Sequence, residues 1–184
     1  MPEDRVSQLL SLVASGSQIG PIVSSSHLAE GAMPALSEVE FALTMTQNAF
    51  SRWMVRCMKA AGVDGLAPLD VFLLHTVNHR GRAKTLSDIC TILNIEDTHT
   101  VSYSLKKLER AGLVSSGKRG KEKSVEITPE GEAACQRYRE VREALLVKVL
   151  KAMNVDETEL TNLAALMRAL SGHYDQAARA AASL

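Results

Sequence analysis

The strongest constraint on this fold is a run of closely spaced helix signals between residues 85 and 112. Thr85 and Asp88 have the spacing of a capping box, and Asn94 can close the helix that they open in a left-handed turn. A second helix begins at residue 96 or 97 and ends at Gly112. Two short helices joined by so tight a turn predict a helix-turn-helix.

A β-hairpin is predicted directly after the second helix. Leu113 and Val114 begin one strand, and residues 124–127 form the other. Residues 115–123, rich in glycine and lysine, are expected to form the turn between them. A helix-turn-helix followed by such a hairpin is a winged helix-turn-helix, a fold that commonly binds DNA.

The second helix has two unlike faces at 100° per residue. Leu105 and Leu108 fall within about 40° of Val101 and predict the core side, whereas the opposite face is polar, cationic and aromatic. That face suits a DNA major groove, in which hydroxyl, imidazole and phenol groups reach base edges and cations neutralise phosphates. The expected base-reading region comprises Thr98, His99, Thr100, Ser102 and Tyr103, and the expected backbone contacts are Lys106, Lys107 and Arg110.

The charge distribution agrees with this interpretation, although the chain of 184 residues has a net charge of zero. Residues 98–124 contain seven basic and two acidic side chains, and the rest of the chain contains 14 basic and 19 acidic ones. A basic segment in a neutral chain is typical of an electrostatic footprint on nucleic acid, and its alternative is an ordinary solvated surface. The hairpin adds four expected contacts, Lys118, Arg119, Lys121 and Lys123.

Long apolar stripes flank this segment and predict a dimer. They run along helices expected over residues 36–62, opened by a capping box at Ser37 and Glu40, and over 129–180, with a break at Asn154. Together they exceed what one small lobe can cover, so a second copy is the simplest partner. The predicted fold class is mainly α with a small β-hairpin, organised as an N-terminal arm (1–35) and a winged-helix DNA-binding and dimerisation domain (36–184) with its DNA-binding lobe over about 66–128.

Within this framework, the sequence resembles the multiple-antibiotic-resistance regulator (MarR) family. The resemblance covers residues 86–131 and includes Leu-Glu-Arg-Ala-Gly-Leu-Val at 108–114 and Ile-Thr-Pro-Glu-Gly at 127–131. It implies a homodimeric transcription factor, often a repressor on a pseudo-palindromic site, and sometimes one released by a small-molecule effector. The sequence departs from the family pattern in two places. The wing usually has Asp-x-Arg in the family and reads Arg-Gly-Lys here at 119–121, and the N-terminal arm is longer than usual.

Other chemistry has weaker support in the sequence. His75 and His79 have the i, i+4 spacing of a metal pair, but no clustered cysteine pair accompanies them, so no metal or cofactor is expected. No catalytic fingerprint is present, and no enzyme activity is expected. Cys57, Cys90 and Cys135 are expected to be reduced and buried, and no apolar run is long enough to span a bilayer, so we expect a cytoplasmic protein. The alternatives are a winged-helix module that binds protein and a small-ligand sensor with weak DNA binding.

Overall fold

The computed structural model describes residues 20–184, which divide into two compact units at the bond between Arg56 and Cys57. The spacing of Val6, Leu9, Leu10 and Val13 also predicts a short helix within residues 5–14, which lies outside the described residues. In the first unit, helix α2 (Ser26–Ala29) interrupts the segment predicted to be an irregular arm. The long helix α3 (Pro34–Ala60) follows it and ends in the second unit.

Helix α3 begins earlier than its sequence signals predict. The predicted cap, Ser37, lies inside the helix, and its Oγ donates to the carbonyl oxygen of Leu28 at 2.9 Å. The capping box with Glu40 was therefore a wrong prediction, because Pro34 starts the helix one turn upstream. Proline is favoured at a first helical position, where its missing N–H costs nothing. Ser37 instead connects α3 to the segment that contains α2.

The second unit contains the predicted helix-turn-helix, preceded by α4 (Pro68–Asn78). Helix α5 (Leu86–Leu93) has the capping box of Thr85 and Asp88, and ends at Asn94 with φ of 53°. Helix α6 (Thr98–Arg110) is capped by Asp97. These boundaries confirm the sequence predictions: both helix starts rest on hydrogen bonds from nearby backbone N–H groups to a short polar side chain, and α5 ends where Asn94 takes a left-handed conformation.

The hairpin is longer than predicted and belongs to a three-stranded antiparallel sheet. Strand β2 (Val114–Arg119) pairs with β3 (Glu122–Ile127), and β1 (Lys84–Thr85) pairs with the other side of β3. The predicted turn over 115–123 was wrong, because only Gly120 and Lys121 separate the strands. Cross-strand pairing outweighs the weak strand propensity of glycine and lysine here. The two-residue strand β1 was not predicted.

The C-terminal helices follow the predicted order. Thr128 caps α7 (Pro129–Arg142), which continues through a π-helical segment η2 (Glu143–Val147) into α8 (Lys148–Ala152). The π-helical segment was not predicted, because the apolar stripe through it keeps a nearly helical period. Asn154 has φ of 53°, as expected of a break, and Asp156 caps the last helix, α9 (Glu157–Ala181).

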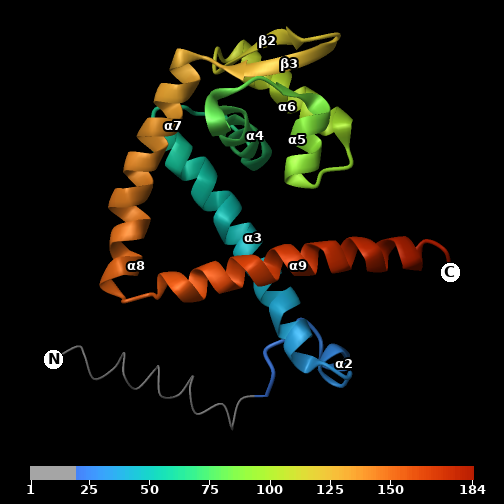
Figure 1. The fold of residues 1–184 in the computed structure, drawn as a ribbon. Helices are drawn as coiled ribbons and strands as arrows, with labels where there is room; N and C mark the ends of the chain where they lie inside the picture. The colour runs from blue at the N-terminus through green and yellow to red at the C-terminus, as the bar shows by residue number, and fades with distance from the viewer. Residues whose placement is uncertain (1–19) are drawn as a thin grey trace. The chain divides into compact units, whose positions relative to one another are not determined.

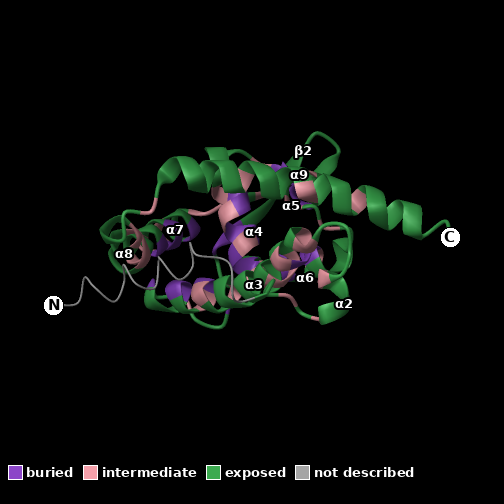
Figure 2. Cartoon of the chain, turned by 90° about the horizontal axis from the view of Figure 1, so that it is seen from below, coloured by how far each residue is buried: buried purple, intermediate pink, exposed green. Residues whose placement is uncertain are grey.

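The core of the second unit lies around α4, with the helix-turn-helix and the sheet gathered beside it (Figure 1). The apolar residues predicted for the core side of α6, Val101, Leu105 and Leu108, are buried. Helix α9 contrasts with α4, since none of its residues is buried and Figure 2 shows it almost wholly exposed. The structure therefore positions α6 and the hairpin on a firm aliphatic core.

Candidate nucleic-acid interface

Helix α6 presents a cationic and aromatic face to solvent. Tyr103 has 66% of its surface exposed, and Lys106 and Arg110 are exposed on the same side of the helix. The buried residues Ser104, Leu105 and Leu108 anchor the other side. The sequence-predicted division of this helix into a core face and a free face is thus observed. Such a face can offer hydroxyl, imidazole, amine and guanidine donors to a groove.

The first turn of α6 is held by its N-terminal cap. Asp97 Oδ1 accepts hydrogen bonds from the backbone N–H groups of His99 at 2.9 Å and Thr100 at 3.2 Å. The hydroxyl of Thr100 donates to the other oxygen, Oδ2. These hydrogen bonds lower the pKa of Asp97, and the bond from the Thr100 hydroxyl has the largest effect. The Thr98 and His99 side chains remain exposed, whereas the Thr100 hydroxyl is already occupied.

Lys107 differs from its neighbour Lys106 because it forms an ion pair within the protein. Its Nζ lies 2.6 Å from Oδ2 of Asp70, a carboxylate only 2% exposed. The same Asp70 oxygen accepts the backbone N–H of Ala67 at 2.7 Å, ahead of α4. The ion pair between Lys107 and Asp70 therefore links α6 to α4. Sequence periodicity placed Lys107 beside the cationic stripe and gave no sign of this partner.

The hairpin carries its cations on both strands and in the turn. Lys118, Lys121 and Lys123 are exposed. Arg119 instead reaches back to α5, where its Nη1 lies 2.8 Å from Asp88 Oδ2 and 3.5 Å from the carbonyl oxygen of Ala83. The pKa of Asp88 is lowered, first by the backbone N–H of Thr85 and then by Arg119. Arg119 thus restrains the wing against the helix-turn-helix.

A close backbone approach joins the wing to α7. Thr128 donates its Oγ1 hydrogen to the carbonyl oxygen of Gly112 at 2.7 Å, and its N–H to the carbonyl oxygen of Leu113 at 3.2 Å. Gly131 packs on the same Leu113 carbonyl, where no side chain would fit. The conspicuous sequence at 127–131 is therefore a structural joint that fixes both ends of the hairpin.

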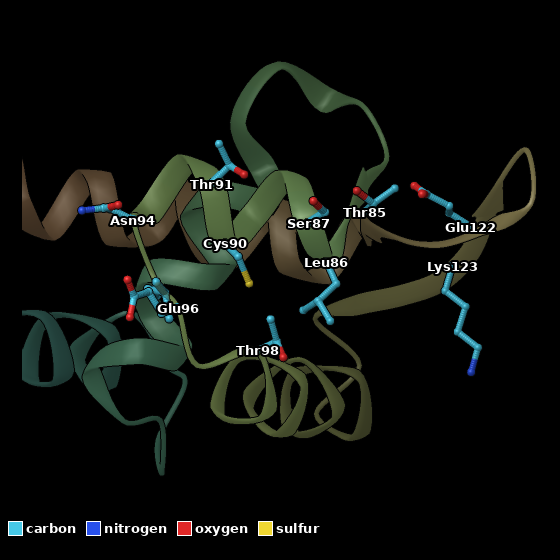
Figure 3. Close-up of a pocket in the computed structure, with 11 residues that line it drawn as sticks. Thr85, Leu86, Ser87, Cys90, Thr91, Asn94, Glu96, Thr98, Glu122 and Lys123 are labelled. Carbon is cyan, nitrogen blue, oxygen red and sulfur yellow. The ribbon is translucent and has the colours of Figure 1, made fainter. Parts of the chain in front are cut away.

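An open cleft of about 670 Å³ lies between α5, the start of α6 and the wing. Leu86, Cys90 and Thr98 point into it from the two helices, and Lys123 stands on the strand that borders it (Figure 3). The hydroxyl of Ser87, at the second position of α5, lies on its rim. Ser87 is not among the contacts predicted from the sequence, although a serine near a helix start is a signal that could have indicated a polar contact.

The two histidines with metal-like spacing have separate surroundings. His75 packs edge-on against Tyr138, with ring centroids 4.6 Å apart, and burial lowers its pKa. His79 is exposed at the end of α4. Residues 20–184 contain no group of three histidine, cysteine or acidic side chains that could hold a metal ion. Over the same residues, no helix has the length and apolar character needed to cross a membrane.

Comparison with known proteins defines the class of this lobe. Residues 66–131 match the family model described as a winged helix DNA-binding domain. Residues 66–131 are therefore similar to winged-helix DNA-binding domains, and the predicted fold class is confirmed. One curated relative, a LexA repressor of Lactobacillus helveticus, is 38% identical over 60 residues, which span 33% of this chain and 28% of that protein.

Solved structures extend the similarity of fold beyond this lobe. A MarR family regulator from Neisseria meningitidis, NMB1585, matches 77% of this chain and 94% of its own, with a TM-score of 0.61 and 19% identity. The M. tuberculosis transcriptional regulator MosR, solved in complex with DNA, matches 72% and 95%, with a TM-score of 0.55 and 19% identity. The predicted resemblance to MarR family regulators is thus confirmed in the fold.

Proposed function

We propose that this protein is a homodimeric transcriptional regulator that binds a pseudo-palindromic DNA site, most simply as a repressor. The observation that carries the proposal is the exposed cationic and aromatic face of α6, opposite a fully buried apolar face. A helix that only faces solvent needs nothing more than polar residues on its exposed side. The exposed side of α6 also carries Tyr103 and His99 beside its cations. The match to a DNA-binding domain over the same residues supports it.

Within α6, the first two turns are proposed to read bases. Thr98, His99 and Tyr103 are exposed, and Ser102 is half-buried beside them, so their donors can reach base edges. Thr100 contributes by holding the cap, because its hydroxyl is bound to Asp97. Lys106 and Arg110, further along the helix, contact phosphates, and Lys107 positions the helix through Asp70.

The wing supplies a second group of phosphate contacts. Lys118, Lys121 and Lys123 extend into solvent at the hairpin, and Arg119 holds it through Asp88. A phosphodiester strand that passes between α6 and the wing would lie along the cleft that Ser87 and Lys123 border. Residues 119–121 read Arg-Gly-Lys in place of the family's Asp-x-Arg pattern, and Arg119 forms an ion pair with Asp88 at the start of α5.

The dimer is proposed from the apolar surface that one chain leaves exposed. Helix α9 has no buried residue among its 25, yet Leu160, Leu163 and Leu166 are about half exposed on it. An amphipathic helix of this kind requires an apolar partner. We propose that the helices over residues 36–62 and 129–180 interlock with those of a second copy, and that the lobe over 66–128 carries the DNA contacts. The dimer would act in the cytoplasm, where its three free cysteines stay reduced.

DNA binding and its salt dependence test the proposal. Genomic fragments selected by the purified protein should contain two half-sites roughly 34–36 Å apart. The slope of log affinity against log salt should approach −0.9 for each phosphate contact, and Lys106→Ala should reduce it by about one contact. His99→Ala and Tyr103→Ala should instead change base preference. No binding to any fragment at low salt would refute the proposal and favour a protein-binding module.

A second candidate function, response to a small effector, is favoured by a cavity between α4 and α7. It has a volume of about 290 Å³ and is lined by His75, Tyr138, Arg139 and Arg142, among others. The Nε2 atom of His75, one of these lining residues, is buried and has no hydrogen-bond partner in the described part of the chain. An aromatic acid would suit an aromatic wall beside two guanidinium groups. A thermal-shift screen of aromatic acids and metals tests this, and His75→Phe should abolish a genuine shift.

A further inference from the structure

The connection from α4 to β1 is a basic loop that lies outside the predicted interface. Residues 79–83 and Lys84, the first residue of β1, read His-Arg-Gly-Arg-Ala-Lys and contain no acidic side chain. Arg80 and Arg82 are exposed, and neither forms an ion pair among residues 20–184. The loop leads directly into the sheet, where Lys84 pairs with Val125 of β3. It is thus an unassigned cationic surface next to the strand that carries the wing.

The buried ammonium of Lys84 fixes this loop. Lys84 is only 3% exposed, and its Nζ donates to the carbonyl oxygens of Val77 at 3.0 Å, His79 at 2.6 Å and Arg82 at 3.3 Å. The three hydrogens of the ammonium are therefore all used to hold backbone. A loop clamped at both ends presents its arginines with little conformational freedom left to lose on binding.

The backbone at Arg80 is strained. Its φ of 63° and ψ of 14° lie in the left-handed region, and Gly81 follows with φ of 56°. Glycine or asparagine usually occupies such a position, because a β-carbon there meets the following carbonyl. Strained residues cluster at binding sites, so an arginine at this conformation is a reason to look for a contact that its side chain makes.

The loop and the wing lie within reach of one another. Arg119, next to the turn of the wing, has its Nη1 3.5 Å from the carbonyl oxygen of Ala83. The same guanidinium neutralises Asp88 at the start of α5. The wing and the loop are therefore neighbours, and the carboxylate of Asp88 beside Arg119 is already paired.

From these observations we infer that Arg80 and Arg82 bind DNA phosphates flanking the segment contacted by α6 and the wing. The inference rests on the proposed DNA-binding function and extends it to a longer footprint. Such contacts would add affinity without base preference, since guanidinium groups on a phosphate backbone read no sequence.

Arg80→Gly separates this role from a structural one. Glycine relieves the left-handed strain, so the melting temperature should stay equal or rise. Binding to a mixed-sequence duplex longer than both half-sites should nevertheless weaken about fivefold near 0.15 M salt, and the salt slope should fall by about 0.9. Arg82→Ala should give a similar loss, whereas Arg80→Lys should keep most of the slope. Lys148→Ala, which removes an exposed charge on α8, is the matched control and should change neither quantity.

The length of the duplex provides an independent readout. When the DNA is trimmed to the half-sites alone, wild-type protein and Arg80→Gly should bind equally. If both Arg80→Gly and Arg82→Ala keep the wild-type salt slope of binding to the long duplex, the inference is overturned and the proposed function is left intact. Absence of any salt-dependent binding by the wild-type protein would overturn both.

Discussion

Replacing Gly131 by alanine tests whether the joint between wing and α7 depends on a close backbone approach. A β-carbon at this position would lie 2.7 Å from Cδ1 of Ile127 and 2.9 Å from the carbonyl carbon of Leu113, and closer still to the oxygen of that carbonyl. Carbon atoms attract best at about 3.5–4.0 Å, so the helix or the strand must move. The Leu113 oxygen cannot simply turn away, because it accepts the N–H of Thr128.

The expected cost follows from the contacts that would be lost. Overpacking costs about 1–3 kcal/mol, and each weakened hydrogen bond at Thr128 adds about 1 kcal/mol. Alanine returns up to about 1 kcal/mol through its helix propensity. The net loss in the free energy of unfolding is about 2–4 kcal/mol, which for a chain of this size lowers the melting temperature by about 5–15 °C.

Thermal unfolding followed by circular dichroism measures this effect. Gly172→Ala on α9 is the matched control, because it makes the same change within a helix where a β-carbon meets nothing within 4 Å. Its melting temperature should be unchanged or slightly higher at the same protein concentration. A Gly131→Ala protein that melts within about 2 °C of wild type, less than 1 kcal/mol for a chain of this size, would refute the reasoning about the joint.

Three further predictions follow from the site. Lys107→Met should lower the free energy of unfolding in urea by about 2–4 kcal/mol, because it leaves the buried Asp70 unpaired. The control Lys106→Met should lower it by less than about 0.5 kcal/mol and should mainly reduce the salt slope of DNA binding. Equal stabilities of the two variants would contradict the ion pair. Hydrogen bonds from Thr100 lower the pKa of Asp97 below its usual 3.8, so the stability that the ionised carboxylate contributes is present above pH 3.8 and is lost as the pH falls through the lower folded-state pKa. Asp97→Asn keeps a cap, and its free energy of unfolding should fall less between pH 5 and pH 2 than that of the wild type. An identical pH profile of the two proteins would argue against the cap. Burial raises the pKa of Cys135 to about 11, and raises that of Cys57, so mass spectrometry should find both thiols unlabelled by iodoacetamide at pH 8 in folded protein and labelled in urea; labelling at equal rates in both states would be inconsistent with their burial.

The sequence by itself determined the local elements of this protein. Thr85, Asp97, Thr128 and Asp156 were predictable as caps because each bonds backbone two or three residues away, and Asn94 as a helix end because it tolerates a left-handed turn. The cationic face of α6 was predictable for a similar reason, since helical periodicity is a property of a single segment.

Only the tertiary structure decided which cations are free. Lys106 and Lys107 are neighbours in the sequence, yet one is exposed and the other is bound to Asp70, 37 residues away. Arg119 is likewise committed to Asp88, while Arg80 and Arg82 are left exposed next to the wing. Ion pairs between distant segments depend on how the helices pack, and a one-dimensional pattern carries no information about that packing. The same holds for strand β1 and for the two-residue turn of the wing, where long-range strand pairing outweighs the local signal.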